Sequence, residues 1–274
     1  MADVRPFSVI VMAAQRAGVL NPLAARAGVS HKCIVPLRGK PLIEYVYEIL
    51  ADTPGVTHVR VSVEPEAWEP VRALAAPLAA KGITFDIVEN ETSIADSAYK
   101  AAEGIEGPFL ITTADNVIMT PDAILKAMDP IWGNADVTIG LTTREAVLKA
   151  RGEQSSPSNQ NVGPYKLRDC RISNCNLYGF KGRHVLQAAE FFREGGQFSK
   201  NKGRLVRAVG VGTFILGALK LLTLEGLTKR LSKRFRVRIK SVVLEDGSQA
   251  IDVDNFRTYD LAEMILEKRE AAGA

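Results

Sequence analysis

Three acidic residues follow stretches of the sequence that read as β-strands. The apolar run Phe109–Thr113 leads through one small residue to Asp115, and the stretch Ala250–Asn255 carries Asp252 and Asp254 just before a predicted helix. A carboxylate at a strand end suits Mg²⁺, which binds one or two carboxylates together with phosphate oxygens of a substrate. Side chains at positions i and i+2 of a strand point to the same face, so Asp252 and Asp254 should lie together. We therefore expect Asp115 and Asp254 to bind Mg²⁺, with Asp252 as the first substitute.

Both expected ligands also have a purely structural interpretation. Asp115 can cap the loop that leads to the helix opening at Thr120-Pro121, and Asp254 can cap the last helix. The place of Asp115 at a strand end favours the metal. For Asp254 the two interpretations stay open.

The connection after the first predicted strand is a third feature that can do chemistry. It begins with small residues, from Ala13 to Gly18, among which backbone N–H groups can approach a phosphate chain closely. Lys32 follows, and a cation there can offset the charge that gathers on an attacked phosphate. The connection matches neither of the standard glycine-rich phosphate-binding motifs. Taken alone, it does not favour nucleotide binding over a surface loop with a solvated lysine.

Strands and helices alternate around these residues. The predicted strands are Phe7–Met12, His58–Val63, Thr84–Val88, Phe109–Thr113, Asp136–Leu141, Val237–Leu244 and Ala250–Asp254, with short strands between Tyr165 and Phe180. The predicted helices are Pro41–Leu50, Glu66–Lys81 ending at Gly82, Ser93–Glu103, one opening at Thr120-Pro121, Arg183–Arg193, most of Lys200–Arg234 with breaks near Gly210, Gly212 and Gly226, and Phe256–Glu270. Residues 151–164 are rich in Ser, Asn, Gln, Gly and Pro and are predicted to form a loop. This alternation indicates an α/β fold with a mostly parallel sheet, whose strands end at a common ligand-binding edge.

Composition narrows the class of protein. The chain has 274 residues, 46% hydrophobic and 24% charged, and a formal net charge of +4, which does not call for nucleic acid as a partner. Cys33, Cys170 and Cys175 are odd in number and irregularly spaced, which argues against a disulfide framework. The apolar run from Phe7 to Ala14 is too short to span a bilayer and does not read as a signal peptide. We expect a cytoplasmic protein.

The order of these motifs resembles the MobA-like NTP transferase family, nucleotidyltransferases of the glycosyltransferase-A type fold. The resemblance rests on the small-residue loop, the lysine, GKPLI from Gly39, the strand ending in Asp115 and the late IDVD. It covers Val9 to Asp129 and returns at Cys175–Phe180 and Ala250–Ile265. It implies a three-layer α/β/α Rossmann-like fold, with a mainly parallel central sheet and a small antiparallel extension that holds the acceptor. We expect residues 1–274 to form one such domain.

The resemblance also assigns roles to particular residues. It places the phosphate loop at Ala13, Ala14, Gln15, Arg16, Ala17 and Gly18, the triphosphate-contacting lysine at Lys32, the Mg²⁺ ligands at Asp115 and Asp254, and the contacts to nucleobase and ribose at Ser93, Asp96 and Ser97. The loop departs from the family pattern L-A-A-G-x-G-x-R. Gln15 and Ala17 replace its glycines, Val19 replaces its arginine, and His31 stands where a proline usually precedes the lysine.

The expected function is transfer of a nucleotidyl group from an NTP to a phosphorylated small molecule, with release of pyrophosphate. One alternative is a glycosyltransferase that uses a nucleotide-sugar, since the fold is shared. The sequence Ala114-Asp115-Asn116 lacks the Asp-x-Asp expected of that class. A second alternative is a nucleotide-binding relative without catalysis. The presence of Lys32, Asp115 and Asp254 argues against this alternative.

An apolar stretch from Leu205 to Leu231, followed by a basic cluster from Lys229 to Lys240, has two interpretations. Apolar stripes in soluble chains are usually core, so the favoured one is that these residues cover the sheet or form a contact between two copies in a homodimer. The other is peripheral contact of residues 205–240 with the inner face of a membrane, which would make the acceptor, among the sugar, polyol and lipid-headgroup phosphates expected, a lipid phosphate or a headgroup precursor handled there.

Overall fold

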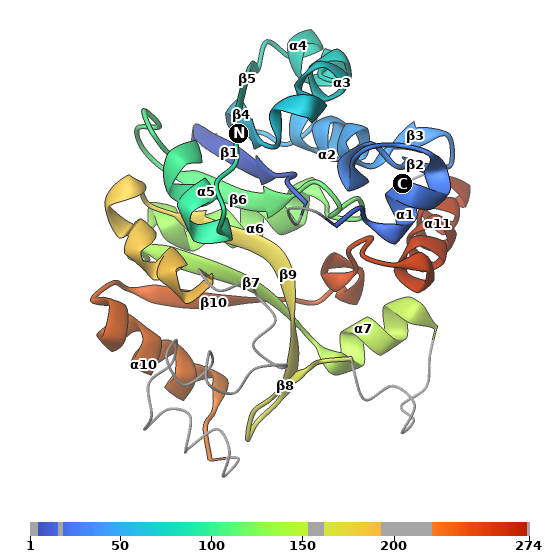
Figure 1. Ribbon diagram of the computed structural model, residues 1–274. Coiled ribbons are helices and arrows are strands. Elements are labelled where there is room, and N and C mark those ends of the chain that lie inside the picture. The colour runs from blue at the N-terminus through green and yellow to red at the C-terminus, as the bar shows by residue number, and fades with distance from the viewer. Residues whose placement is uncertain (1–4, 16–18, 153–161, 193–220, 273–274) are drawn as a thin grey trace.

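The computed structural model of the chain describes residues 5–15, 19–152, 162–192 and 221–272 (Figure 1). An eight-stranded sheet forms its centre, in the order β10-β7-β9-β6-β1-β4-β5, with β8 paired to β9. Its strands are β1 (Phe7–Met12), β4 (Val56–Ser62), β5 (Thr84–Val88), β6 (Phe109–Thr113), β7 (Val137–Thr143), β8 (Tyr165–Lys166), β9 (Arg171–Phe180) and β10 (Ile239–Leu244). A second, two-stranded sheet joins β2 (Pro36–Leu37) to β3 (Lys40–Pro41).

The helices connect these strands. The α-helices are α1 (Pro22–Ala27), α2 (Leu42–Ala51), α3 (Trp68–Ala73), α4 (Ala76–Ala80), α5 (Ile94–Ala101), α6 (Pro121–Trp132), α7 (Arg144–Arg151), α10 (Leu224–Phe235) and α11 (Phe256–Ala271). Shorter-pitched 3₁₀ segments are η1 (Lys32–Ile34), η2 (Pro65–Ala67), η4 (Arg183–Phe192) and η6 (Gly247–Ala250). None of the helices in the described residues is long and apolar enough to cross a membrane.

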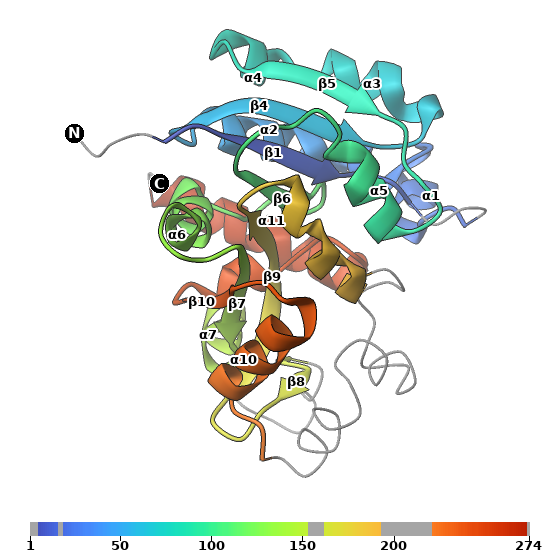
Figure 2. The same cartoon turned by 90° about the vertical axis from the view of Figure 1, so that its left-hand side faces the viewer.

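The strand directions confirm the predicted sheet. Strand β1 pairs in parallel with both β4 and β6, β4 with β5, and β7 with β10. Strand β9 runs antiparallel between β6 and β7, and β8 pairs antiparallel with its beginning. Figure 2 shows β5, β4 and β1 along one side of the sheet and β9, β7 and β10 along the other. The mainly parallel sheet with a small antiparallel extension is therefore present.

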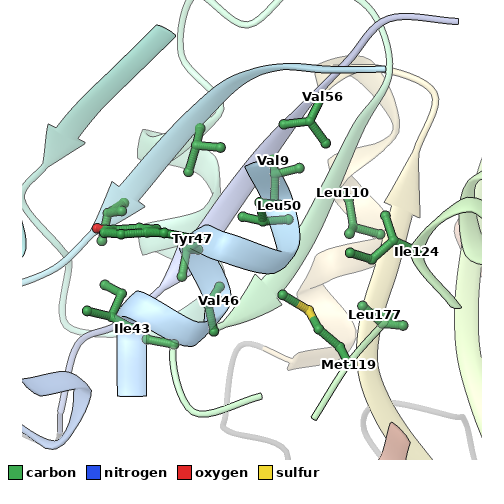
Figure 3. Close-up of a cluster of buried hydrophobic side chains, with 14 of the residues drawn as sticks. Val9, Ile43, Val46, Tyr47, Leu50, Val56, Leu110, Met119, Ile124 and Leu177 are labelled. Carbon is green, nitrogen blue, oxygen red and sulfur yellow. The ribbon is translucent and has the colours of Figure 1, made fainter. Parts of the chain in front are cut away.

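Alternate side chains of β1 enter two separate cores. Val9 and Val11 join a buried cluster with residues of α2, α3, α4 and α6, whereas Ile10 joins a cluster with residues of α5, η4 and α10. Figure 3 shows the first cluster, where Tyr47 and Leu50 of α2 face the sheet. Each fully buried aliphatic or aromatic side chain of this kind stabilises the fold by roughly 1.5–3 kcal/mol. Helices on both faces of the sheet give the predicted three-layer α/β/α arrangement.

Two predictions about individual segments are wrong, and two helices were not expected. The single helix expected over Glu66–Lys81 is divided into η2, α3 and α4, because Pro77 at the start of α4 lacks the N–H that would continue the helix from α3. Helices α1 and α7 were not expected; Asn21 and Thr143 cap their N-termini and Gly28 and Gly152 end them in the left-handed conformation. The break predicted near Gly226 lies just before it, because residues 221–223 are not helical and α10 begins at Leu224, with the N–H of Gly226 bonded to Thr223 in its first turn. The strand expected over Ala250–Asp254 is absent and is treated with the site below.

Helix α10, in the described part of the apolar stretch, covers the sheet. Leu231 of α10 is buried in the core that lines the α5 side of the sheet, and Leu227 and Phe235 pack against it. The basic residues of α10, such as Lys229, Arg230 and Lys233, are exposed. Residues 205–220, and with them Gly210 and Gly212, lie outside the described part of the chain. The interpretation as core is confirmed for α10.

An ion pair between Asp136 and Arg238 holds the residue that precedes β10. Asp136 accepts hydrogen bonds from the backbone N–H of Arg238 at 2.8 Å and from its guanidinium at 2.6 and 3.0 Å. These bonds to Arg238 lower the pKa of Asp136 from 3.8 to about 2. A carboxyl whose pKa is depressed by folding stabilises the protein above its unfolded pKa and loses that contribution as the pH falls through the folded value.

We therefore expect Asp136→Asn to lower the free energy of unfolding by about 1–2 kcal/mol at neutral pH. The difference from wild type should shrink as the pH falls below about 4 and vanish only below about pH 2. Urea denaturation of both proteins across this range measures it. Asp52→Asn, which removes one partner of the exposed Asp52–Lys81 pair, is the control and should show little dependence on pH. A constant difference at all pH values would contradict the assignment.

Candidate active site

The side chain of Lys32 lies among carboxylates that come from distant parts of the chain. Its ammonium group donates a hydrogen bond to Asp254 Oδ1 at 2.8 Å and another to Asp115 Oδ2. Asp252 completes the group, because one oxygen each of Asp115, Asp252 and Asp254 lies within 4.8 Å of the others. Lys32 opens η1, Asp115 follows β6, and Asp252 and Asp254 lie between η6 and α11. The fold thus brings together the three residues that sequence analysis singled out for catalysis, with Asp252 added.

The segment that carries Asp252 and Asp254 is irregular, although its side chains alternate as they would on a strand. η6 ends at Ala250, and Ile251 and Val253 are buried in a core with residues of α1, α2 and α11. The two aspartates between and after them therefore face away from that core. The N–H of Val253 donates to the carbonyl of Asp115 at 3.1 Å. One backbone hydrogen bond thus replaces the predicted strand pairing and joins the two acidic segments.

Gln249 fixes the start of this segment to the loop after β6. Its carbonyl oxygen accepts the N–H of Thr120 at 3.1 Å, and its amide donates to the carbonyl of Ile118 at 3.3 Å. Because Gln249 is buried, these hydrogen bonds are protected from competition with water. These bonds therefore hold the backbone segment that carries Asp252 and Asp254 against the loop that carries Asp115.

The capping interpretation of Asp254 is wrong, and the carboxylate of Asp115 bonds to Lys32 rather than to the loop that follows it. Thr120 caps α6, and Asn255 caps α11 in a reciprocal capping box with Thr258. Asp254 contributes only its backbone N–H there, which donates to Thr258 at 2.9 Å. The carboxylate of Asp254 is thus available to Lys32.

One oxygen of Asp115 lacks the partner that a buried carboxylate needs. The Asp115 side chain is 8% exposed, and its Oδ1 has no hydrogen-bond partner within the described residues. A buried polar atom without a partner costs about 1–3 kcal/mol, so such atoms mark places where a ligand or ion binds. Three carboxylates at this spacing offer the oxygen ligands that Mg²⁺ or Ca²⁺ prefers. The residues present therefore fit a divalent cation.

The electrostatics of the cluster show an excess of negative charge. Burial, followed by the charges of Asp115 and Asp254, raises the pKa of Asp252 well above its usual value. Burial alone would lower the pKa of Lys32, but the neighbouring Asp115 and Asp254 outweigh it and raise that pKa above its ordinary value. Lys32 is thus a permanent cation, and one ammonium group faces three carboxylates.

The first loop is held by residues that sequence analysis did not assign. The N–H of Gln15 donates to Glu64 Oε1 at 2.9 Å, and Glu64 Oε2 lies 3.6 Å from Nε2 of the buried His31. The Gln15 side chain donates to the carbonyl of Ser30 at 3.0 Å. Glu64 follows β4 as Asp115 follows β6, so the rule that identified Asp115 applied to it as well. His31, found in place of the usual proline, therefore lies beside an anionic group.

The other residues predicted to contact the nucleotide are not part of the acidic cluster. Ala13 and Ala14 continue β1 at the same edge of the sheet, with the N–H of Ala13 bonded to Ser62 at 2.9 Å. Arg16, Ala17 and Gly18 lie outside the described residues. Ser93 caps α5 by accepting the N–H of Asp96, and the Ser97 hydroxyl bonds to the backbone of Ser93 and Glu91. These hydroxyls stabilise the start of α5, and their expected contacts with a nucleobase remain a prediction.

Several solved structures share this fold. A hypothetical transferase from Thermus thermophilus has a TM-score of 0.70 at 23% identity, covering 93% of this chain and 99% of that one. The 4-diphosphocytidyl-2C-methyl-D-erythritol synthase from Anaerococcus prevotii has a TM-score of 0.58 at 11% identity, covering 97% and 100%. The inositol-1-phosphate CTP transferase from T. maritima has a TM-score of 0.53 at 12% identity, covering 96% and 97%. At these identities the likeness establishes the fold.

No curated protein matches the chain. The family model for the MobA-like NTP transferase domain matches residues 9–153 of the sequence. This range is more than half of the chain and includes the first loop, Lys32 and Asp115. This chain belongs to the MobA-like NTP transferase domain family of nucleotidyltransferases.

Proposed function

We propose that the protein transfers an NMP group from an NTP to a phosphorylated small molecule and releases pyrophosphate, with Mg²⁺ as its cofactor. The convergence of Lys32 with Asp115, Asp252 and Asp254 at the ligand-binding edge of the sheet carries this proposal. Family membership supports the same class of reaction. The central sheet joins strands from β1, near the start of the chain, to β10, near its end. This supports the further proposal that residues 1–274 form one nucleotidyltransferase domain.

Asp115, Asp252 and Asp254 are the residues that would hold Mg²⁺. Bound there, the cation would neutralise charge on the phosphate oxygens of the nucleotide and so favour attack on phosphorus. The unpartnered Oδ1 of Asp115 is the best-placed ligand atom, because it is buried and has no competing donor among the described residues. Asp254 is more exposed and lies on the solvent side of the cluster.

Lys32 supplies a fixed positive charge for the triphosphate. Its raised pKa keeps the ammonium protonated at neutral pH, and the hydrogen bonds to Asp115 and Asp254 hold it in place. A cation that is already oriented needs no reorganisation when charge develops on the phosphate. The N–H groups that follow β1 at Ala14 and Gln15 lie in the predicted phosphate loop, and Ser93 to Ser97 remain the proposed place for the base and ribose.

The reaction itself requires little covalent help from the protein. An oxygen of the acceptor phosphate attacks the α-phosphorus, a new phosphorus–oxygen bond forms, and the bond to the β-phosphate breaks to release pyrophosphate. The acceptor phosphate is already ionised at neutral pH, so no strong general base is needed. Positioning of the two substrates and neutralisation of charge supply most of the acceleration.

A substrate screen tests this proposal. Each of the four NTPs is incubated with Mg²⁺ and with a panel of sugar, polyol and lipid-headgroup phosphates, and pyrophosphate release is measured. CTP and inositol-1-phosphate belong in the panel because the name of one structural neighbour includes both. We expect pyrophosphate release that depends on both an NTP and a phosphorylated acceptor. Nucleotide binding without turnover across the panel would favour the non-catalytic alternative.

The structure also bears on the glycosyltransferase alternative. Asn116 and Val117 follow Asp115, so the second acid of an Asp-x-Asp motif is absent there, and Asn116 is 1% exposed and donates to the carbonyl of Cys175 at 3.0 Å. Its Nδ2 thus fixes the loop after Asp115 to β9. Release of nucleoside diphosphate from a nucleotide-sugar, without pyrophosphate, would be the result that favours a glycosyltransferase.

Glu64 yields a prediction about nucleotide affinity. Its carboxylate accepts the Gln15 N–H in the predicted phosphate loop, so an anionic nucleotide meets a negative charge there. Glu64→Gln removes the charge and keeps an acceptor oxygen for that N–H. We expect the variant to lower KM for the NTP up to about tenfold, or ~1.4 kcal/mol.

Steady-state kinetics at saturating acceptor measure this effect. Glu66→Gln is the matched control, since it makes the same change at an exposed residue two positions along. It should leave KM unchanged. A Glu64→Gln variant with weaker nucleotide binding would show instead that the carboxylate supports the loop in its binding form.

A further inference from the structure

Asn176 adopts a backbone conformation that side chains rarely take. Its φ angle is 51°, in the left-handed region, which asparagine tolerates better than most residues. It lies on a bulge of β9: Leu141 of β7 pairs with Asn174 and Ile139 pairs with Tyr178, so that residues 175–177 lie opposite Gly140 alone. Such bulges redirect side chains and concentrate near active sites.

Close packing fixes the bulge in place. A Cβ atom on Gly140 would lie 3.0 Å from the Cβ of Leu177 and 3.1 Å from its carbonyl oxygen, so any larger residue there would press on the bulge. On the other side, the Cys175 carbonyl accepts the amide of Asn116, the residue that follows Asp115. Two hydrogen bonds therefore link the bulge to the acidic region, one from Asn116 to the Cys175 carbonyl and one from Asn176 to Asp252.

The amide of Asn176 points at the acidic cluster. Its Nδ2 donates to Asp252 Oδ2 at 3.3 Å. Asp252 is one of the three carboxylates that lie within 4.8 Å of one another, and Lys32 bonds to the other two, Asp115 and Asp254. The hydrogen bond from Asn176 is thus a side-chain contact from outside the acidic cluster that orients Asp252.

A relay of hydrogen bonds leaves the Asn176 amide one orientation. The backbone N–H of Asn176 can only donate, and it donates to Asn174 Oδ1 at 3.2 Å. The Asn174 amide must therefore present its NH₂ group, which donates to Asn176 Oδ1 at 2.8 Å and to the hydroxyl of Tyr178. Asn176 in turn presents its NH₂ group to Asp252. Rotating either amide by 180° would place donor against donor and oxygen against oxygen.

We propose that Asn176 is a positioning residue that aims the Asp252 carboxylate at the bound cation. This inference rests on the proposed function, because it assumes that the acidic cluster holds a divalent cation. An amide suits the task, since it donates a hydrogen bond to the carboxylate and carries no charge to repel the cation. Groups that orient metal ligands in this way typically change metal affinity 10- to 100-fold when they are removed.

The test measures binding of Mn²⁺ to the full-length protein by the loss of the free-ion EPR signal. Asn176→Gly keeps the left-handed backbone and removes the amide, so the fold should keep its stability. We expect its Kd for Mn²⁺ to rise about tenfold. Turnover should fall at low Mg²⁺ concentration and recover at saturating Mg²⁺, because the ligand is misdirected rather than lost.

Arg236→Gly is the matched control. Arg236 also has a positive φ, of 55°, but it is exposed at the end of α10, so the change to glycine should leave Mn²⁺ binding unaltered. Asn174→Ala is a second variant in case Asn176→Gly does not fold. It leaves Asn176 in place and releases its amide, so Mn²⁺ should bind more weakly, by a smaller factor.

The outcomes separate the inference from the function on which it rests. If Asn176→Gly binds Mn²⁺ as tightly as wild type while Asp115→Asn loses binding, Asn176 has no positioning role and the metal site stands. If wild type itself binds no Mn²⁺ with or without an NTP, both the metal site and the inference fail. Weakened Mn²⁺ binding by Asn176→Gly with unchanged unfolding supports the inference.

Discussion

Replacing Asp115 with asparagine should lower kcat/KM for nucleotidyl transfer by about 10³-fold, or ~4 kcal/mol, while the protein stays folded. The reason is that Asp115 offers the one buried carboxylate oxygen of the cluster that lacks a partner among the described residues. Asparagine keeps the size of the side chain and still reaches Lys32, but it binds a divalent cation weakly. Loss of one negative charge also relieves the repulsion that Asp115 exerts on Asp252, so the free energy of unfolding should not fall.

Pyrophosphate release and urea denaturation together measure these two expectations. Asp254→Asn should reduce activity similarly, because Asp254 shares the Lys32 ammonium with Asp115. Asp129→Asn makes the same chemical change at an exposed residue of α6 and should leave activity intact. Near-normal turnover by both Asp115→Asn and Asp254→Asn would show that the cation site is wrongly assigned, and Asp252→Asn would then be the variant to measure.

The sheet could be predicted from the sequence because its strands are short apolar runs between clear breaks. Phe7–Met12, Thr84–Val88 and Phe109–Thr113 have the predicted bounds. The signal fails where local sequence does not decide the backbone. Val253 is buried and alternates with aspartates as on a strand, yet a single bond to Asp115 replaces the ladder. Periodicity reports which face is buried and does not report whether a neighbouring strand is present.

The site could be predicted in part for a related reason. Asp115 is marked by its place after a strand, and Lys32 and Asp254 by the order of motifs along the chain. Asn176 carries no such mark, because its role depends on a positive φ and on a bulge opposite Gly140. Glu64 is marked in the same way as Asp115, but its partner, the Gln15 N–H, lies 49 residues away and becomes evident only in the fold. Residues that act through long-range contacts are thus the ones that sequence reasoning misses.

Lys32→Ala should lower kcat/KM for the NTP by about 10²- to 10³-fold, through a higher KM and a lower kcat. The ammonium is the cation that the described residues place between Asp115 and Asp254, and its removal leaves three carboxylates without a positive partner. Unpaired buried charges are costly, so the variant should be less stable than wild type in the presence of EDTA. Mg²⁺ should restore stability, because a divalent cation compensates the same carboxylates.

Lys40→Ala is the control for Lys32→Ala. Lys40 lies on β3, pairs with Glu48 at 2.6 Å and sits 4.5 Å from the centre of the Tyr45 ring. These are surface interactions worth roughly 1 kcal/mol or less, so its loss should leave kinetics near wild type and stability insensitive to Mg²⁺. Kinetics and thermal unfolding with EDTA or Mg²⁺ separate the two lysines. Equal effects at both positions would remove the case for Lys32 as the triphosphate-binding cation, since position beside the carboxylates is the only property that distinguishes it.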